Sequence, residues 1–264
     1  MFSKKKRMLE ILKELKRNYG MLAVKAEFEA EGSRLDELIM LDELVNRADV
    51  DLFIKIGGCE AIRDLDQCKL LGATGIMAPM IETPFAMKKF KNAANKVYKD
   101  QIDQIEWIIN TETITCLNNI EGILDEGKGF LNTIAIGRVD LSASMNLDRK
   151  DIDCDTMHKA VNTFAVAAKT RNLKVGIGGG VSTDSLGGIL SHRKNIDKFE
   201  TRKIVFSINN EEYVLSQGLV LAMEFEILYL QYKCEFYGDM ANEDLSRLKM
   251  LEDRYQIAKS KEKI

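Results

Sequence analysis

The sequence predicts an α/β fold built around a parallel sheet, and its length suits a single (β/α)8 TIM barrel. Short runs of apolar and β-branched residues recur along the chain, and each is followed by turn residues and then by a stretch with helical periodicity. The chain has 264 residues, and barrels of this class typically have about 250. Because no Gly/Ser-rich or Pro-rich linker divides it, we expect one domain over residues 1–264.

Seven strands can be placed from the apolar runs. Glycines mark the ends of several of them, as at Gly57 after the second and Gly178 after the sixth. An eighth strand is not obvious, so it is placed only loosely, or the barrel is irregular there. The seven expected strands cover residues 21–28, 51–56, 75–79, 104–110, 132–136, 174–177 and 202–207.

Helical segments are expected at both ends of the chain. Residues 1–20 place Met8, Ile11, Leu12 and Leu15 on one face of an amphipathic helix, which we expect to plug the bottom of the barrel. A membrane-surface role for this helix is the lesser alternative. From about residue 211 to 264 the pattern is again helical and longer than one barrel helix requires. This tail either packs across a neighbouring subunit or covers its own barrel floor, and the sequence favours neither.

Composition limits the classes of partner. The net charge is −3, so a nucleic-acid-binding surface is not expected. The basic start lacks the apolar segment of a signal peptide, and no apolar run approaches the roughly 20 residues of a membrane span. Five cysteines without a CxxC pair fit free thiols in a reducing compartment. We therefore expect a cytoplasmic protein without a membrane partner.

Polar residues gather where the expected strands end, which is where barrel enzymes carry their chemistry. Several are carboxylates, and bringing like charges together is costly unless a cation or a proton compensates. Mg²⁺ or Mn²⁺ would be the simplest compensation. Spacing alone leaves this open, because any α/β chain has acidic residues after some strands. The strand-end residues are Glu27, Glu29, Lys55, Gly57, Glu82, Glu112, Arg138, Asp140, Gly179 and Gly180, and Arg202 belongs to a charged cluster at the start of the seventh expected strand.

Three sequence blocks resemble the HpcH/HpaI aldolase and citrate lyase family. Residues 75–83 (GIMAPMIET) are similar to the family's third-strand segment. Residues 111–123 (TETITCLNNIEGI) and 136–145 (IGRVDLSASM) are similar to its two metal-site blocks, in the same order and at similar spacing. The likeness covers roughly residues 50–145. It implies a TIM barrel, a divalent metal and a homo-oligomer.

The resemblance implies that Glu112 and Asp140 are the metal ligands. The metal would chelate the carboxylate and keto oxygens of pyruvate or a similar 2-keto acid and stabilise the enolate formed when a carbon–carbon bond breaks or forms. The alternative for Glu112 is a carboxylate favoured by a helix N-terminus. The alternative for Asp140 is a helix N-cap.

The chain also departs from the family pattern. Lys55 stands where the family usually has an arginine that holds the substrate oxygen, so the charge remains but the two-pronged donor is lost. A Schiff-base role for Lys55 and an ion pair with Glu27 or Glu29 are alternatives. No histidine follows the first strand, which leaves Glu27, Glu29 or metal-bound water as the base. Met80 replaces the lysine of the citrate lyase branch.

The remaining strand-end residues are assigned to substrate binding. Gly57, Glu82 and Arg138 follow the second, third and fifth expected strands. Gly179 and Gly180 could present backbone N–H groups to an anion, or simply form a tight turn. Arg202 could hold a substrate anion with two parallel hydrogen bonds, or form a rim pair with Glu200.

The leading hypothesis is a metal-dependent carbon–carbon lyase or aldolase that acts on a 2-keto acid. Lys55 supports the developing enolate, and Glu27, Glu29 or water moves the proton. A lyase or hydrolase of acyl-CoA thioesters on the same platform is the second hypothesis. The third is a barrel that binds metal and ligand without turnover, and the missing arginine and histidine motivate it.

Overall fold

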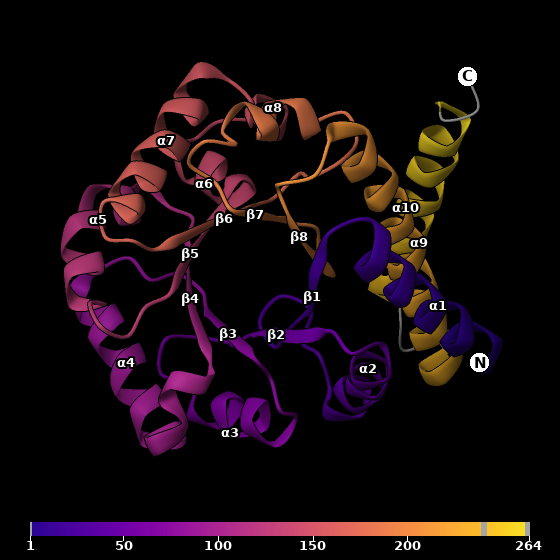
Figure 1. Cartoon of the computed structure of the whole chain (residues 1–264), viewed down its shortest axis with the longest axis horizontal. Helices are drawn as coiled ribbons and strands as arrows, with labels where there is room; N and C mark the ends of the chain where they lie inside the picture. The colour runs from indigo at the N-terminus through magenta and orange to yellow at the C-terminus, as the bar shows by residue number, and fades with distance from the viewer. Residues whose placement is uncertain (1, 239–241, 262–264) are drawn as a thin grey trace.

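The computed structural model describes residues 2–238 and 242–261. Its centre is a closed barrel of eight strands that follow one another in chain order, with helices around the outside (Figure 1). The strands are β1 (Met21–Glu27), β2 (Asp51–Lys55), β3 (Gly75–Ala78), β4 (Glu106–Thr111), β5 (Thr133–Gly137), β6 (Lys174–Gly178), β7 (Lys198–Glu200) and β8 (Ile204–Ser207).

The first six expected strands are confirmed to within two residues at each end, whereas the last part of the barrel differs from the prediction. Strands β1 to β7 pair in parallel, but β8 is antiparallel to both β7 and β1. The expected seventh strand at residues 202–207 is in fact β8 with its preceding turn. Only residues 201–203 separate β7 from β8, which is enough for a hairpin but far too short for a parallel crossover.

The helices follow local signals in the sequence. Thr83 and Thr113 each accept a hydrogen bond from the backbone N–H three residues later, so they cap α4 and α5. Pro84 occupies the first turn of α4, where its missing N–H costs nothing. The α-helices are α1 (Phe2–Asn18), α2 (Leu35–Ala48), α3 (Ile62–Leu70), α4 (Pro84–Tyr98), α5 (Ile114–Glu126), α6 (Arg138–Ser144), α7 (Asp155–Lys169), α8 (Leu186–Ser191), α9 (Glu212–Tyr237) and α10 (Asn242–Lys261), with 3₁₀ turns at Lys99–Gln104 and Arg149–Asp151.

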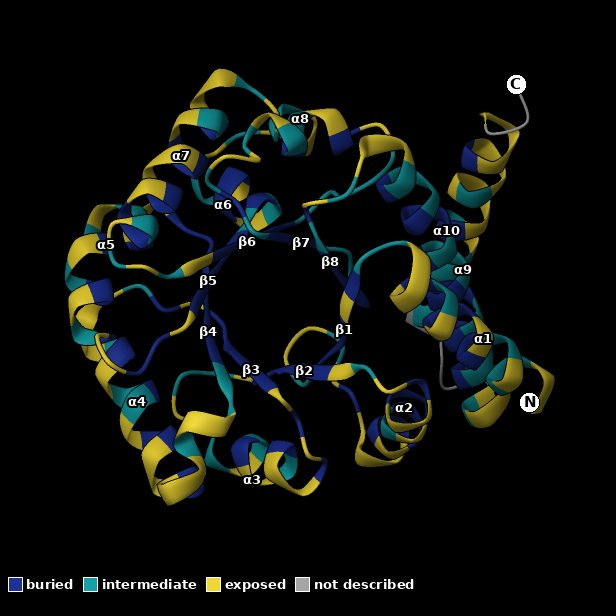
Figure 2. Cartoon of the chain, in the orientation of Figure 1, coloured by how far each residue is buried: buried dark blue, intermediate teal, exposed yellow. Residues whose placement is uncertain are grey.

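Most buried residues lie between the strands and the surrounding helices, as the dark-blue inner ring of Figure 2 shows. Inside the barrel, a small separate cluster includes Phe53, Met77 and Val205. The ring of Phe53 occupies the space beside Gly75, where an added Cβ would lie 2.4 Å from the ring. In the layer of Phe53, Met77 and Val205 the barrel interior is therefore a packed core. Polar side chains that could carry chemistry lie nearer the strand ends.

The terminal helices pack together outside the barrel. Helix α1 buries Met8, Ile11, Leu12 and Leu15, but it packs against α9 and α2 rather than plugging the bottom of the barrel as expected. Helix α9 contacts β8 through Gly218, next to which the Phe206 ring lies. The C-terminal helices are therefore present as predicted, but α9 covers the side of the barrel and not its floor.

Helix α9 corrects one further expectation. It is long enough and apolar enough, with a mean hydropathy of 1.3 over an 18-residue window, to meet the length and composition of a membrane span. Of that window, 56% is buried inside the protein. The helix is enclosed by α1 on one side and α10 on another. Its apolar character is thus accounted for by packing within the fold.

Candidate active site

Lys55 and Glu112 form the centre of the candidate site, at the C-terminal ends of β2 and β4. The ammonium nitrogen Nζ of Lys55 lies 2.5 Å from Oε2 of Glu29 and 4.0 Å from Oε2 of Glu112. Lys55 is only 8% exposed and Glu112 only 2%. The expected interior ion pair of Lys55 is therefore formed with Glu29, and Glu112 is a second carboxylate within reach of the same ammonium.

The Glu112 carboxylate is held in a fixed position by its neighbours. Its Oε1 accepts a hydrogen bond from the backbone N–H of Met80 at 3.1 Å, and its Oε2 accepts one from Nδ2 of Asn110 at 2.8 Å. Met80 adopts a φ of 52°, a left-handed conformation that is rare for such a side chain. On the other side, a Cβ added to Gly137 would lie 2.8 Å from Oε2. The carboxylate is therefore placed by β3, β4 and β5 together.

Electrostatics at Glu112 favour a cation beside it. Burial raises the pKa of Glu112, and the negative charge of Asp140 raises it further, whereas Lys55 and the hydrogen bonds from Asn110 and Met80 oppose the shift. Asp140 is exposed and lies in the first turn of α6. The two predicted metal ligands are thus neighbours in the fold, although they are 28 positions apart in the sequence.

The structure also bears on the alternatives for these two carboxylates. Thr113, not Glu112, caps α5 with its side chain. Gly137 occupies the N-cap position of α6, so Asp140 is three residues inside the helix and not its cap. The helix dipole still favours a carboxylate at Asp140.

The donor set suits an ion that keeps part of its water shell. Within residues 2–238 and 242–261, no group of three or more His, Cys, Asp or Glu side chains is arranged to hold a metal ion. Glu112 and Asp140 would supply two oxygen ligands and leave the other positions to water and substrate. Mg²⁺ is commonly bound by one or two carboxylates in this way.

Lys55 stays positively charged in this setting. Burial works against the charge, but Glu112, Glu29 and Glu27 outweigh it and raise the pKa of the Lys55 ammonium. A lysine that forms a Schiff base must lose its proton, which usually requires a lowered pKa. The surroundings of Lys55 therefore favour a role as a fixed positive charge.

The two candidate bases on β1 differ in their contacts. Glu29 is paired with Lys55, as described above. Glu27 is buried, and its Oε1 lies 3.6 Å from Nη1 of Arg202, which is longer than a hydrogen bond. Arg202 does not form the alternative pair with Glu200, because Glu200 is paired with Lys25 inside the barrel. Glu27 is therefore the less firmly engaged of the two carboxylates.

Three residues assigned to substrate binding make contacts within the protein. Buried Arg138 donates from Nε and Nη2 to the carbonyl oxygen of Gly179, at 3.1 and 2.9 Å, and from Nη1 to Asp153 at 2.5 Å. Glu82 accepts a hydrogen bond from the hydroxyl of Thr113 at 2.7 Å. Both side chains brace loops around the site. Their substrate-binding assignment stays a prediction, as does that of Gly57, whose N–H donates to Asp64.

The glycine run after β6 forms a tight turn against α6. Gly179 and Gly180 have φ values of 81° and 65°. A Cβ on Gly179 would lie 2.8 Å from the backbone nitrogen of Val139, and one on Gly180 would lie 2.4 Å from Cδ1 of Ile152. Backbone conformation and close packing thus account for both glycines without an anion.

Sequence reasoning missed the polar residues that point into the barrel. Asn110 is buried beside Glu112, and its Oδ1 has no partner among the described residues. Lys25 pairs with Glu200 from β1 to β7. Asn110 could have been found from the sequence, because alternate residues of a strand point to the same face and Asn110 lies two positions before Glu112.

Residues 48–185 match the family model described as HpcH/HpaI aldolase/citrate lyase. The chain belongs to this family. The matched segment covers just over half of the sequence and includes Lys55, Glu112 and Asp140. Membership of the HpcH/HpaI family supports a lyase function for the chain.

Comparison with solved structures supports the same fold. An HpcH/HpaI aldolase/citrate lyase family protein from Burkholderia cenocepacia superposes with a TM-score of 0.59 at 16% identity, over 71% of this chain and 81% of that one. An HpcH/HpaI aldolase from Desulfitobacterium hafniense gives 0.60 at 14% identity, over 71% and 78%. The citrate synthase SbnG gives 0.58 at 16%, over 74% and 81%. No curated protein matches the chain. At such identities, these likenesses establish the barrel fold and nothing about the substrate.

Proposed function

We propose that this HpcH/HpaI family member is a divalent-metal-dependent lyase that makes or breaks a carbon–carbon bond in a 2-keto acid such as pyruvate. The observation that carries the proposal is the arrangement of Glu112, Asp140 and Lys55. Two neighbouring carboxylates lie with a buried ammonium at the strand ends of a family barrel. Mg²⁺ or Mn²⁺ held there would act as a Lewis acid on the keto oxygen.

Lys55 would stabilise negative charge that develops on the substrate oxygen. Its Nζ is fixed 2.5 Å from Glu29 and 4.0 Å from Glu112, so the charge is positioned before the substrate arrives. A preorganised charge of this kind is effective because the site need not rearrange during the reaction. Lysine cannot offer the planar two-pronged contact of arginine, so it would hold the oxygen as a point charge.

Glu27 is our choice for the group that moves the proton. It projects from β1 directly beside Lys55, with which it is paired in the strand register. Its only ion pair among the described residues is the long contact with Arg202. A carboxylate that is close to the site and not tightly paired can take up and return a proton, whereas Glu29 is held by Lys55.

The metal assignment predicts that Glu112→Ala and Asp140→Ala abolish Mn²⁺ binding. Each substitution removes one of the two proposed protein ligands, and we expect the remaining carboxylate to be too weak to hold the ion alone. Titration of Mn²⁺ followed by electron paramagnetic resonance measures this directly. Asp148→Ala is the matched control, because Asp148 is an exposed carboxylate whose only ion pair among the described residues is with Lys150. Unchanged affinity in both site variants would contradict the assignment.

Activity can be tested without knowing the second substrate. Proton NMR of pyruvate in D₂O should show a metal-dependent loss of the methyl signal, because an enolate exchanges its protons with solvent. The loss should be absent in Asp140→Ala and strongly reduced in Lys55→Met. Glu27→Gln should slow exchange while leaving Mn²⁺ affinity unchanged, which separates proton transfer from metal binding.

One observation favours a second candidate, a barrel that binds ligand without turnover. The Lys55 ammonium is already paired with Glu29, which fits a structural replacement for the family arginine. Pyruvate and Mn²⁺ would then bind, but no methyl exchange would occur with pyruvate or any other 2-keto acid.

A further inference from the structure

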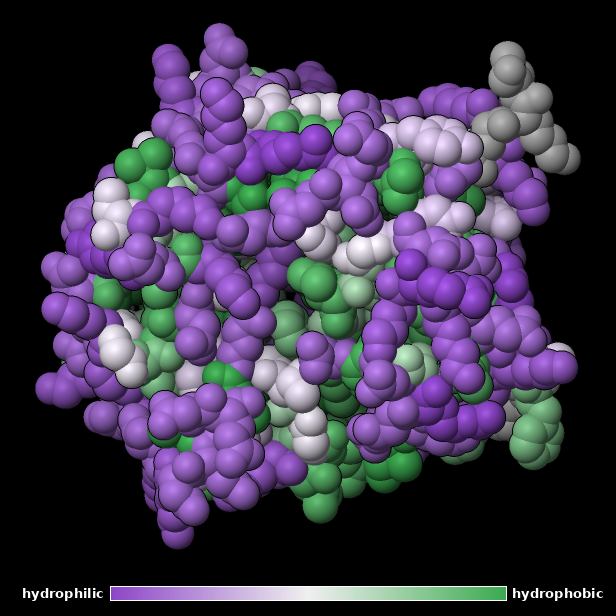
Figure 3. Space-filling model, viewed as in Figure 1, coloured by the Kyte–Doolittle hydropathy of each residue, from purple (hydrophilic) through white to green (hydrophobic). Residues whose placement is uncertain are grey.

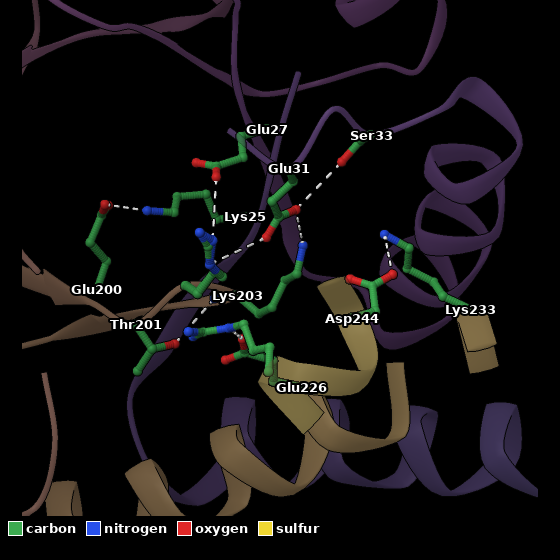
Figure 4. A network of polar contacts seen from close by, with 12 residues as sticks. Lys25, Glu27, Glu31, Ser33, Glu200, Thr201, Lys203, Glu226, Lys233 and Asp244 are labelled. Atoms are coloured by element: carbon green, nitrogen blue, oxygen red, sulfur yellow. Dashed lines mark hydrogen bonds and ion pairs between the residues drawn. The ribbon is translucent and has the colours of Figure 1, made fainter. Parts of the chain in front are cut away.

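A polar cavity lies beside the candidate active site, and we propose that it binds a small anion through a phosphate or carboxylate group. The cavity lies between α9, α10, the loop after β1 and the turn between β7 and β8, and it has a volume of about 80 Å³. Most of its lining comes from residues 202–247, outside the segment matched by the family model. Figure 4 shows the network of charged side chains around it.

The lining of the cavity carries more positive than negative charge. It contains four cationic groups and three carboxylates, so the lining itself has one positive charge in excess at neutral pH. Two carboxylates just outside the lining also face these cations, because Glu27 lies 3.6 Å from Arg202 and Glu37 lies 3.4 Å from Lys233. An anion would therefore be held by directed hydrogen bonds and not by net charge. The carboxylates are Glu31, Glu226 and Asp244, and the cationic residues are Arg202, Lys203, Lys233 and Arg247.

Three of the four cations are well paired, and Arg202 is not. Lys203 is hydrogen-bonded to Glu31, Arg247 donates to Glu226, and Lys233 lies 3.2 Å from Asp244. The two ion pairs of Arg202, with Glu27 and Glu31, are 3.6 and 3.8 Å long. Both are beyond hydrogen-bond length. The guanidinium has five N–H donors, and its planar fork suits the two oxygens of a carboxylate or phosphate.

Tyr229 supplies an independent observation. This lining residue is 1% exposed, and its hydroxyl has no hydrogen-bond partner among the described residues. Leaving a buried polar group unpaired is energetically costly. The ammonium groups of Lys203 and Lys233 lie 4.6 and 5.8 Å from the centre of the Tyr229 ring. An anionic oxygen would give the hydroxyl an acceptor close to these two ammonium groups.

The position of Arg202 links this cavity to the candidate active site, because the same guanidinium also faces Glu27. Two sources of the anion are therefore compatible with the geometry. It is either the far end of a substrate whose keto group lies at Lys55, or a separate small anion. Both share the same recognition chemistry, and the experiment must separate them.

Isothermal titration of the full chain with inorganic phosphate tests the site itself. We expect saturable binding with one site per chain. Arg202→Gln and Tyr229→Phe should each weaken binding by about tenfold or more, as for a hydrogen bond to a charged group. Tyr229→Phe removes a hydroxyl that bonds nothing among the described residues, so the fold should be retained and can be checked by circular dichroism.

Arg171→Gln is the matched control, because Arg171 is bonded to Glu121 and Asp125 at the surface. It removes the same charge and should change phosphate affinity by less than about twofold. The proposal is overturned if the wild-type protein shows no saturable binding up to about 10 mM phosphate. It is equally overturned if both site variants bind like the wild type, or if Arg171→Gln weakens binding as much as they do.

A second arm identifies the source of the anion and rests on the proposed lyase function. Methyl or methylene exchange in D₂O is compared for pyruvate and 2-ketoglutarate, with and without phosphate. Competition by phosphate against 2-ketoglutarate but not pyruvate would assign the cavity to the far carboxylate of the substrate. An equal effect on both would indicate a separate effector. Phosphate binding without any exchange would count against the lyase function and leave the anion site standing.

Discussion

Glu112 shows how one side chain can be both firmly placed and electrostatically unfavourable. Two hydrogen-bond donors and the absence of a side chain at Gly137 fix its carboxylate, while burial and Asp140 raise its pKa. A buried carboxylate that is costly to ionise is typical of a binding or catalytic site and contributes little to the stability of the fold. Ionising Glu112 therefore costs the free protein stability, and a bound cation would remove this cost.

The raised pKa predicts how Glu112→Gln changes stability with pH. The folded protein holds the Glu112 proton more tightly than the unfolded chain, so the wild type loses stability relative to the variant as pH rises above the ordinary value of 4.5. Below that value Glu112 is protonated in both the folded and the unfolded wild type. The difference in unfolding free energy between wild type and Glu112→Gln should then no longer change with pH. Urea unfolding in EDTA between pH 4 and 8, with roughly one-unit steps, measures this.

The exposed Glu121→Gln substitution is the control for losing one negative charge. A difference between Glu112→Gln and wild type that does not change with pH would contradict the shift. Added Mn²⁺ should stabilise the wild type and leave Glu112→Gln unaffected, because ligand binding to the folded state alone raises its stability.

Gly137→Ala tests whether the position of the carboxylate matters as much as its presence. The new Cβ would lie 2.8 Å from Oε2 of Glu112 and push the carboxylate away from β5. A displacement of this kind costs about 1–3 kcal/mol, so Mn²⁺ affinity should fall about fivefold or more. Gly58→Ala is the control, because nothing lies within 4 Å of its added Cβ. Equal Mn²⁺ affinity in the two variants would show that Glu112 adapts freely.

At the residue level, the sequence predicted which side chains meet but not what holds them. The placement of Glu112, Asp140 and Lys55 near one another follows from strand ends and the family blocks. The engagement of Arg138 with Gly179 depends on the path of a loop that no periodicity describes. Asn110 could have been found from the alternation along β4, since it lies two positions before Glu112.

The element that escaped prediction is the hairpin of β7 and β8. Strand β7 has three residues, which is too few for an alternating pattern, and the turn at residues 201–203 carries two cationic residues where apolar ones would mark a strand. Thr201 closes the turn by accepting hydrogen bonds from the backbone N–H groups of Lys203 and Ile204. The longer strands were predictable because each buries several consecutive apolar residues.

The turn after β6 gives a prediction at the same scale. Gly179→Ala would place a methyl group 2.8 Å from the backbone nitrogen of Val139, at a φ of 81° that alanine disfavours. Backbone atoms cannot move aside as a flexible side chain can. We therefore expect a loss of about 1–3 kcal/mol in the free energy of unfolding, measured in urea. Gly58→Ala again serves as control, and equal stability of the two variants would mean that the turn is adaptable.

At the scale of the whole molecule, the helices α1, α9 and α10 form one layer on the β1 and β8 side of the barrel. The face seen in Figure 3 is largely hydrophilic, with hydrophobic groups toward its centre and lower edge. Large apolar side chains on the outer helices remain exposed, including Ile257 at 57% and Phe236 at 49%. A second subunit packed on this layer would remove these side chains from water.

We accordingly predict a homo-oligomer, measured by light scattering at micromolar concentration. Ile257→Arg should shift the mass toward the monomer, because a charge at a buried contact is costly to desolvate. Leu70→Arg, at an apolar position on α3 that is 75% exposed, is the control and should leave the mass unchanged. A monomeric mass for the wild type would contradict the prediction.

The direction of β8 has a topological consequence. Strand β8 ends where β1 begins, with the N–H of Ser207 donating to the carbonyl oxygen of Gly20 at 2.9 Å. These two strands are therefore the arms of a hairpin without its loop, and a two-residue turn could join them. Residues 20–207 would then form a cyclic polypeptide. The helices α1, α9 and α10 lie outside this ring in the sequence, so they cover the barrel but do not connect its strands. In a barrel with eight parallel strands, the same ring closure would need a segment spanning the full height of the barrel.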